Sequence, residues 1–174
     1  MHADPIPGDL ADWLAARIPA GWFDGPPEVA ADGEEILVVG RLALPPLPAG
    51  ASEAAASAAC LGRIKEFREA TREQRMRVAG ELEHRFGRRV SWGAACGDRR
   101  SLFTTLSVPV MTRLRLRERA VLDTLIEAGV ARSRSDALAW CVRLVGTHQA
   151  EWIRDLQAAL IAVKKVRAEG PTSG

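Results

Sequence analysis

Four arginines occupy alternate positions in the middle of the chain, at Arg113, Arg115, Arg117 and Arg119. A guanidinium group is permanently charged and carries five N–H donors, so it binds phosphate and carboxylate oxygens and does not act as a base. Within this run, Glu118 is the only acid and offsets part of the charge. We therefore interpret the run as an anion-binding surface and expect its partner to be a polyanion.

Two local structures are open for these arginines. If a helix begins directly after Thr112, Arg113/Arg117 and Arg115/Arg119 become i,i+4 neighbours whose like charges repel. That arrangement either needs a polyanionic partner or is an ordinary solvated helix face. If the run is instead a strand, Met111, Arg113 and Arg115 all point outward on one side.

The distribution of charge along the chain supports a polyanion-facing surface. The whole chain carries a net charge of only +2. Residues 1–60 hold 2 basic and 9 acidic residues, whereas residues 61–119 hold 15 basic and 7 acidic residues. An acidic start beside a basic middle indicates an internal competitor for the arginines, which would weaken binding to nucleic acid.

Further arginines lie in the basic middle of the chain. Those between residues 63 and 86 alternate with glutamates at helical spacing, which is typical of a salt-bridged solvent face. Arg99 and Arg100 follow the turn Gly97-Asp98 with little acid nearby. We expect these two residues to extend a phosphate-binding surface.

Other chemistry has little support in the sequence. Cys60, Cys96, Cys141, His84 and His148 include no pair at metal-ligand spacing, so we expect no metal. No Gly-rich phosphate loop, nucleophile elbow or Cys/His/acid set is evident, so we expect no enzyme, no cofactor and no small-molecule substrate. The absence of a long apolar run predicts no membrane contact, and the widely spaced cysteines indicate reduced thiols in the cytoplasm.

The first half of the chain predicts a mixed α and β structure. Asp9 is placed to cap a helix over residues 10–18, and residues 19–34 are expected to form a surface loop. The β-branched run 35–42 predicts a strand. The stripe of apolar residues that follows predicts one long helix from Ser52 to Phe86, ended by Gly87.

The second half begins with a predicted hairpin and continues with helices. Residues 90–96 and 102–110 are expected to be its strands, since apolar side chains occupy alternate positions in the second. Helices follow up to Ala128, from Ser133 onward and over residues 149–166. Their expected inward residues are Val121, Leu122, Leu125, Ile126, Leu138, Cys141, Leu144, Val145, Trp152, Leu156, Leu160 and Val163.

The stretch from Thr112 to Val145 resembles the ribbon-helix-helix family of DNA-binding proteins, of the CopG and Arc kind. The likeness rests on an alternating strand, then Leu122-Asp123-Thr124-Leu125, then Gly129, then Ser133-Arg134-Ser135-Asp136 opening a second helix. It covers about residues 102–146. The chain departs from the family pattern in having a long segment before the strand and Pro109 within it.

The resemblance implies an intertwined homodimer whose two strands pair and enter the major groove of duplex DNA. It implies that Met111, Arg113 and Arg115 are the outward strand positions nearest the first helix, and that Ser133, Arg134 and Ser135 meet phosphate at the start of the second helix. We expect Arg117 and Arg132 to bind nucleic acid as well.

Taken together, the sequence predicts an α+β fold of a short helix, a strand, a long helix, a β-hairpin and three C-terminal helices. We expect an N-terminal region over residues 1–100, a ribbon-helix-helix-like region over 101–170 and a tail over 171–174. The predicted function is that of a non-enzymatic DNA-binding transcriptional regulator. The alternative is an adaptor whose basic face meets RNA, a ribonucleoprotein or an acidic protein.

Overall fold

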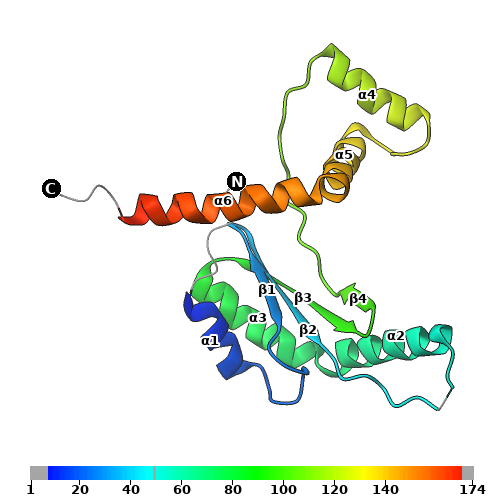
Figure 1. The fold of residues 1–174 in the computed structure, drawn as a ribbon, viewed down its shortest axis with the longest axis vertical. Helices are drawn as coiled ribbons and strands as arrows, with labels where there is room; N and C mark the ends of the chain where they lie inside the picture. Colours follow the sequence, from blue (N-terminus) through cyan, green and yellow to red (C-terminus); the bar gives the residue numbers. More distant parts are fainter. Residues whose placement is uncertain (1–7, 49, 170–174) are drawn as a thin grey trace. The chain divides into compact units, whose positions relative to one another are not determined.

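The computed structural model describes residues 8–48 and 50–169 and falls into two compact units that meet at Pro109 and Val110. Among these residues, the first unit holds a four-stranded sheet and three helices, and the second unit holds three helices (Figure 1). The fold class is α+β, as the sequence predicted. The division lies nine residues beyond the boundary expected after residue 100.

The sheet of the first unit has the strand order β1-β2-β3-β4. The strands are β1 (Glu28–Ala31), β2 (Glu35–Arg41), β3 (Arg89–Cys96) and β4 (Arg99–Leu102). Antiparallel pairing joins β1 to β2 and β3 to β4, whereas β2 and β3 are parallel. A parallel pair needs a long crossover, and here the crossover contains the helices α2 (Glu53–Ala70) and α3 (Arg72–Phe86).

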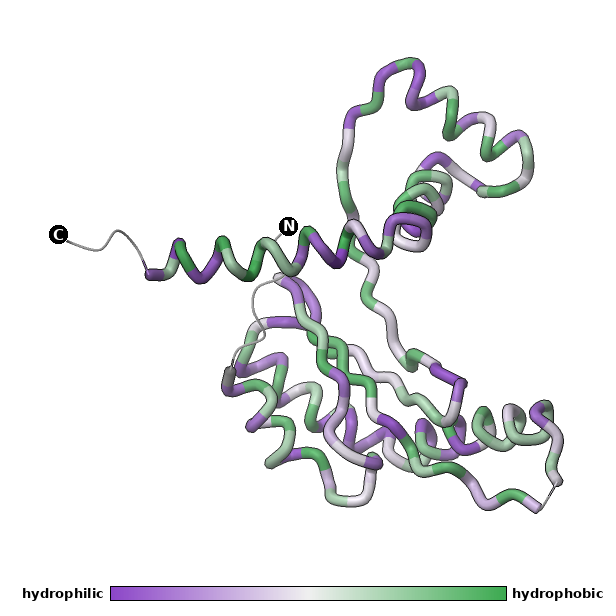
Figure 2. The backbone as a smooth tube through the Cα atoms, viewed as in Figure 1, coloured by the Kyte–Doolittle hydropathy of each residue, from purple (hydrophilic) through white to green (hydrophobic). Residues whose placement is uncertain are grey.

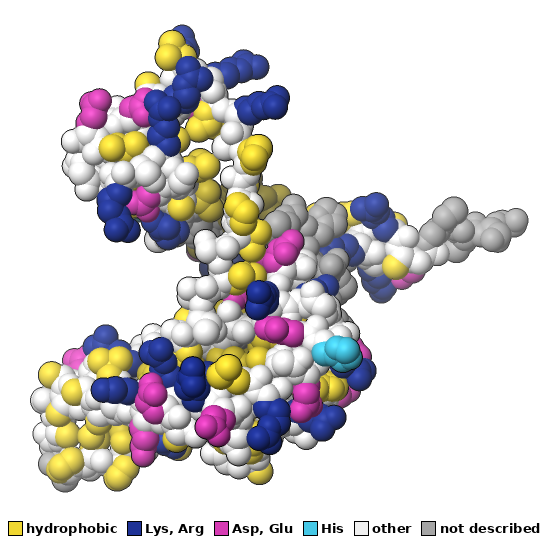
Figure 3. Space-filling view, turned by 180° about the vertical axis from the view of Figure 1, so that it is seen from behind, with side chains coloured by type: hydrophobic (Ala, Val, Ile, Leu, Met, Phe, Trp, Pro, Cys, Tyr) yellow, Lys and Arg dark blue, Asp and Glu magenta, His cyan; other side chains and the backbone are white. Residues whose placement is uncertain are grey.

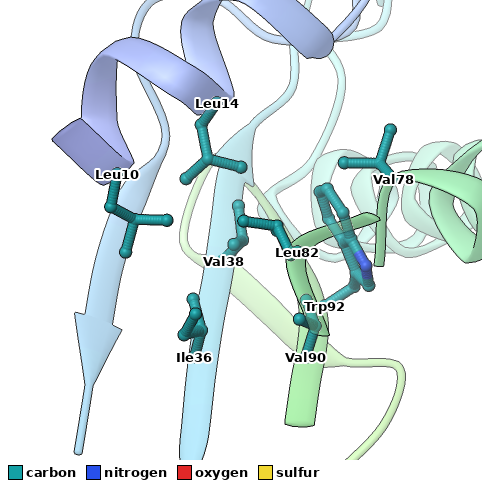
Figure 4. Packing of buried hydrophobic residues seen from close by; sticks show 8 residues of the cluster. All are labelled: Leu10, Leu14, Ile36, Val38, Val78, Leu82, Val90 and Trp92. Atoms are coloured by element: carbon teal, nitrogen blue, oxygen red, sulfur yellow. The ribbon is translucent and has the colours of Figure 1, made fainter. Parts of the chain in front are cut away.

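One face of the sheet is covered by helices, and the core lies between these layers. In Figure 4, α1 (Gly8–Arg17) and α3 direct leucines onto the central strands. This cluster comprises Leu10, Leu14, Ile36, Val38, Val78, Leu82, Val90 and Trp92. A second cluster under α2 comprises Leu42, Cys60, Ile64, Phe67, Ala94 and Cys96. Trp22 and Phe23 pack against both clusters, so the aromatic pair of the Pro/Gly-rich loop belongs to the core.

The single long helix predicted over residues 52–86 is divided at Thr71 into α2 and α3. The Thr71 hydroxyl donates to the carbonyl of Phe67 at 2.6 Å, and it accepts from Nε of Arg75 at 3.0 Å. Such a side chain competes with the helical hydrogen bonds and bends the backbone. Ser52 caps α2 through the N–H of Ala55, and Gly87, with φ of +66°, ends α3 as predicted.

Two expectations for the N-terminal segment are corrected. The helix α1 begins at Gly8, so Asp9 lies in its first turn and is not its cap. Residues 28–31, expected to be part of a loop, form the edge strand β1. This strand has four residues and pairs along one edge. It is too short to show a clear alternation of apolar and polar residues in the sequence.

The strand predicted over residues 102–110 is wrong for this chain. The hairpin partner of β3 is β4, which ends at Leu102, and residues 103–115 belong to no helix or strand. Side-chain oxygens accept there in place of strand carbonyls. The N–H of Trp92 donates to the Thr104 hydroxyl at 3.2 Å, and the N–H of Leu106 donates to the Glu35 carboxylate at 3.3 Å. The turn at Gly97-Asp98 is confirmed.

The second unit contains α4 (Leu116–Glu127), α5 (Arg134–His148) and α6 (Ala150–Glu169). Its buried cluster is limited to Leu122, Ala131 and Ala137, with Leu125, Ile126, Leu138 and Cys141 partly buried beside it. Other residues expected to point inward are exposed: Val121, Leu144, Val145, Trp152, Leu156, Leu160 and Val163. The amphipathic faces exist, but helices of this unit leave them uncovered.

Cys60 and Cys96 form a buried thiol pair within the first unit. The Cys96 thiol donates to the Cys60 sulfur, which lies 3.0 Å away. Burial, together with the hydrogen bond to Cys60, raises the pKa of Cys96 from 9.0 to about 11. The thiol therefore stays protonated in the folded chain at pH values where an unfolded thiol ionises.

This shift predicts a loss of stability in alkali. The raised pKa stabilises the fold fully below pH 9.0, and that contribution is lost as the pH rises toward about 11. Urea unfolding at a series of pH values should show the free energy of unfolding falling across this window. Cys96→Ala should give a flatter pH dependence, and an equally steep fall in that variant would contradict the assignment.

Within residues 8–48 and 50–169, no helix is both long and apolar enough to cross a bilayer.

Candidate nucleic-acid interface

The segment from Ser107 to Leu114, here called the unpaired segment, leads from the first unit into the second. Along it no backbone N–H donates a hydrogen bond within the described part of the chain. Met111 is 97 % exposed and Arg113 is exposed, whereas Leu114 is half-buried against the cluster around Leu122. The expected outward residues Met111, Arg113 and Arg115 are exposed, but so is Thr112 between them, so exposure does not alternate here as it would along a strand.

The helix α4 begins at Leu116, so the arrangement in which it starts after Thr112 is wrong. Arg113 lies before the helix and is not an i,i+4 neighbour of Arg117 on its surface. The Glu118 carboxylate accepts from the N–H of Arg115 and thereby fixes the first turn. Arg119 donates to the carbonyl of Leu114 at 2.9 Å, which leaves its side chain facing the backbone.

Three of the four alternating arginines have no side-chain hydrogen bond or ion pair among the described residues, and the fourth, Arg119, bonds only to the backbone. In the described residues no ion pair involves Arg113, Arg115 or Arg117, and all three are exposed. Figure 3 shows Lys and Arg side chains gathered where the unpaired segment meets α4. Uncompensated guanidinium groups held close together attract an anion with several charges.

The start of α5 supplies a second set of anion-binding groups. Ser133 caps the helix by accepting from the N–H of Asp136 at 3.2 Å, as its position in the capping motif predicted. Asp136 accepts from the N–H of Arg132 at 3.0 Å. The N–H groups of Arg134 and Ser135 lie in the first turn, where a helix offers no acceptor, and the helix dipole is positive there.

Arg134 is engaged within the unit and not free for an external phosphate. Its Nε and a terminal nitrogen donate to the two Asp123 oxygens at 2.7 Å and 2.8 Å. The hydrogen bond from Arg134 holds the pKa of the Asp123 carboxyl below its ordinary value of 3.8. This forked pair ties α4 to the start of α5. Arg132 differs, because its side chain is 97 % exposed and reaches Asp136 only at 3.9 Å.

A shallow groove of about 320 Å³ connects the unpaired segment with both helices. Its walls carry apolar side chains from the unpaired segment and from α4 and α5, and Arg119, Arg134 and Ser135 lie at it. Of the predicted site residues, the structure brings Met111, Arg134 and Ser135 to this groove. The lining does not include Arg113, Arg115, Arg117, Arg132 or Ser133. The Asp123–Arg134 contact has no signal in the sequence, because it depends on how α4 meets α5.

Arg99 and Arg100 belong to the first unit, on β4. Arg99 donates to the Ser57 hydroxyl and lies 3.6 Å from Asp98. Arg100 makes a forked contact with the Glu28 carboxylate at 2.8 Å and 3.2 Å. Both side chains thus have partners within the chain, and the contact to Glu28 lowers the pKa of that carboxyl.

The acidic start of the chain does contact basic residues of the middle. Besides Glu28 and Arg100, Asp9 lies 2.9 Å from Arg85. These exposed pairs stabilise the fold little, and salt weakens them. They show which arginines of the first unit these two acids occupy.

In the described ranges, no group of three His, Cys, Asp or Glu side chains could hold a metal ion.

Comparison with known proteins gives the family. Residues 8–102, more than half of the chain, match the family model described as "Rv1265-like protein, N-terminal domain". The chain belongs to the Rv1265-like family. Residues 115–167 of this Rv1265-like chain match a second model, described as "Mb1296 C-terminal domain". The two matched ranges lie on either side of the division between the units.

Relatives of this Rv1265-like chain occur in mycobacteria. It is 53 % identical over 167 residues to the "Uncharacterized protein Rv1265" of Mycobacterium tuberculosis and to the "Uncharacterized protein Mb1296" of Mycobacterium bovis. In both cases the match covers 96 % of this chain and 72 % of the relative. No solved structure matches.

The turn between α4 and α5 provides a test of the site's backbone. Gly129 has a φ of +73°, in the left-handed region, and a Cβ placed there would meet nothing within 4 Å. Gly129→Val should therefore lower the free energy of unfolding through backbone strain alone, by about 1–3 kcal/mol. Gly129→Asn is the matched control, because Asn tolerates this conformation. Equal urea midpoints for the two variants would contradict this explanation.

Proposed function

We propose that this Rv1265-like chain is a non-enzymatic DNA-binding regulator that acts as a homodimer in the cytoplasm. The observation that carries the proposal is the unpaired segment, residues 107–114, with its exposed arginine and its backbone N–H groups, which, Pro109 aside, meet no acceptor in the described part of the chain. Such a row is an edge ready to pair with another strand.

The partner strand that suits the unpaired segment best is the same segment of a second copy of the chain. Two antiparallel copies would satisfy each other's backbone groups and leave Arg113 and Arg115 outward on one side of a two-stranded ribbon. A ribbon of this width fits the major groove, where an arginine donates to a guanine with two hydrogen bonds. The resemblance to ribbon-helix-helix proteins implies the same arrangement.

The thin core of the second unit also favours a homodimer. Among the residues that the structure describes, fourteen of the twenty exposed large hydrophobic residues lie between Val110 and Val166, although this unit is the smaller one. Val142 and Val145 on α5 are among them. A domain of this size needs to bury more apolar surface than one copy buries here, and a second copy would supply it.

Phosphate contacts would come from the start of α5. The N–H groups of Arg134 and Ser135 and the exposed Arg132 side chain point to the backbone of the duplex as their ligand. The Asp123–Arg134 pair would act by holding α5 against α4, so Arg134 serves as a positioning residue. These groups bind anions and do not transfer protons, which favours binding over catalysis.

An adaptor for RNA or an acidic protein is the second candidate. It is favoured by Val110 and Met111, which are exposed apolar side chains next to the arginines. A mixed apolar and basic surface suits a protein partner as well as a nucleic acid.

Fluorescence anisotropy of the chain with random-sequence duplex DNA, repeated over a series of salt concentrations, tests the proposal. We expect binding that weakens with salt, with a log–log slope of about −0.9 for each phosphate contacted. A single-stranded RNA of equal length and an acidic peptide serve as competitors. No binding to the duplex even at the lowest salt, or tighter binding to either competitor, would refute the DNA proposal.

A further inference from the structure

The helix α6 carries an apolar surface that no other described residue buries. It runs from Ala150 to Glu169, and none of its residues is buried. Trp152 is 56 % exposed, and Leu156, Val163 and Val166 are exposed as well. Figure 2 shows apolar and polar residues alternating along this helix. The surface lies beyond the part of the chain that resembles ribbon-helix-helix proteins.

The apolar residues of α6 follow the spacing of a helix that pairs with another helix. Trp152, Leu156, Ala159, Val163 and Val166, here called the α6 seam, are separated alternately by four and three positions. Alternation of this kind keeps one stripe in contact with a partner helix along its whole length. The helix spans about 30 Å, long enough for such a pair to be specific.

We propose that the α6 seam pairs with the α6 seam of a second copy of this chain, in antiparallel orientation. The proposal is independent of DNA binding, since a chain without affinity for DNA would pair in the same way.

The charges of α6 decide the orientation. Residues 150–159 contain two acids and one base, whereas residues 160–169 contain three bases and one acid. Antiparallel pairing sets the acidic half of each copy beside the basic half of the other. Parallel pairing would bring the two basic halves together, and like charges there repel.

The sizes of the seam residues favour the same orientation. In an antiparallel pair centred near Ala159, Trp152 meets Val166 and Leu156 meets Val163. Each contact then joins a larger side chain to a smaller one, which fills the space evenly. A parallel pair would set Trp152 against Trp152 and Ala159 against Ala159, leaving alternating crowding and gaps.

Cysteine cross-linking tests the pairing directly. Full-length chains with Leu156→Cys and with Val163→Cys, each in a Cys141→Ala background and distinguished by a tag, are mixed and mildly oxidised. We expect a disulfide between the two kinds of chain. We expect none between two Leu156→Cys chains, because seven residues along a helix separate those positions by about 10 Å, too far for a disulfide. A cross-link between two Leu156→Cys chains, or none at all, would overturn the proposal.

Sedimentation velocity supplies the second measurement. Leu156→Glu combined with Val163→Glu should weaken self-association of the chain at least tenfold, because the charges lie within the seam. Ile161→Glu is the matched control: Ile161 is 70 % exposed but lies on the opposite side of α6, so association should be unchanged.

Two outcomes would overturn the proposal by a different route. If the double variant associates like the parent but unfolds at a lower temperature, the seam packs within its own chain. If association and unfolding temperature are both unchanged, the seam has no partner at all. Association lost equally in Ile161→Glu would show that the seam is not the interface.

Discussion

Replacing Arg113 and Arg115 together with alanine should lower the affinity of the chain for duplex DNA by about 100-fold. Both side chains are exposed and have no carboxylate partner among the described residues, so their loss leaves no buried group unpaired. An arginine that contacts a base or phosphate contributes about 1–3 kcal/mol, and about 1.4 kcal/mol corresponds to a factor of ten. Anisotropy at fixed low salt measures the change, and the salt slope should become shallower.

The control for this variant removes the same charge elsewhere in the second unit. Arg143 on α5 and Arg154 on α6 are both exposed and lie outside the candidate interface. Replacing these two by alanine should change the affinity by about threefold or less, because only long-range attraction is reduced. Equal losses in the two double variants would show that net charge, and not the position of Arg113 and Arg115, governs binding.

Gly40→Ala should destabilise the first unit by about 2–3 kcal/mol. A Cβ at Gly40 would lie 2.0 Å from the ring of Phe23. That ring cannot simply move aside, because it packs against Phe67 with the ring centroids 5.4 Å apart and against Trp22 at 6.1 Å. Adding one methyl group in β2 therefore disturbs the aromatic contacts that join the two buried clusters.

Gly33→Ala is the matched control for the change at Gly40. A Cβ at Gly33, just before β2, would meet nothing within 4 Å. Its urea midpoint should stay close to that of the parent, within about 0.5 kcal/mol in free energy. A similar midpoint for Gly40→Ala would mean that Phe23 can leave Gly40 without cost.

The sequence predicted elements whose signal is local. The strand β2 follows from its β-branched run, and the ends of α3 and α4 follow from Gly87 and Gly129, both with positive φ. The break at Thr71 was missed because the apolar stripe continues on both sides of it. The predicted strand over residues 102–110 was wrong because backbone pairing with β3 goes no further than Phe103. Beyond it Leu106 donates to the Glu35 side chain, and no N–H of residues 107–110 donates within the described part of the chain.

The candidate interface likewise contains features with a local signal in the sequence and contacts without one. The exposure of Arg113 and Arg115 could be predicted, because charged side chains are mostly exposed to solvent. The cap at Ser133 could also be predicted from its neighbours. The engagement of Arg134 by Asp123 and of Arg100 by Glu28 could not, because each joins residues that only the folded chain brings together.

The parallel pairing of β2 and β3 has a consequence for how the chain acquires its structure. The two central strands are hydrogen-bonded from Glu35↔Arg89 to Arg41↔Ala95, so every contact between them closes a loop of more than fifty residues. Contacts of such long range form slowly, because the entropy of loop closure is lost before the strands gain from pairing. During synthesis, β2 therefore cannot pair with β3 until β3 has been made. The apolar side chains of Ile36 and Val38 stay exposed until α3 and β3 cover them. Until β3 has been made, the first unit therefore exposes apolar surface that is prone to aggregation, although it has the larger core of the two units once folded.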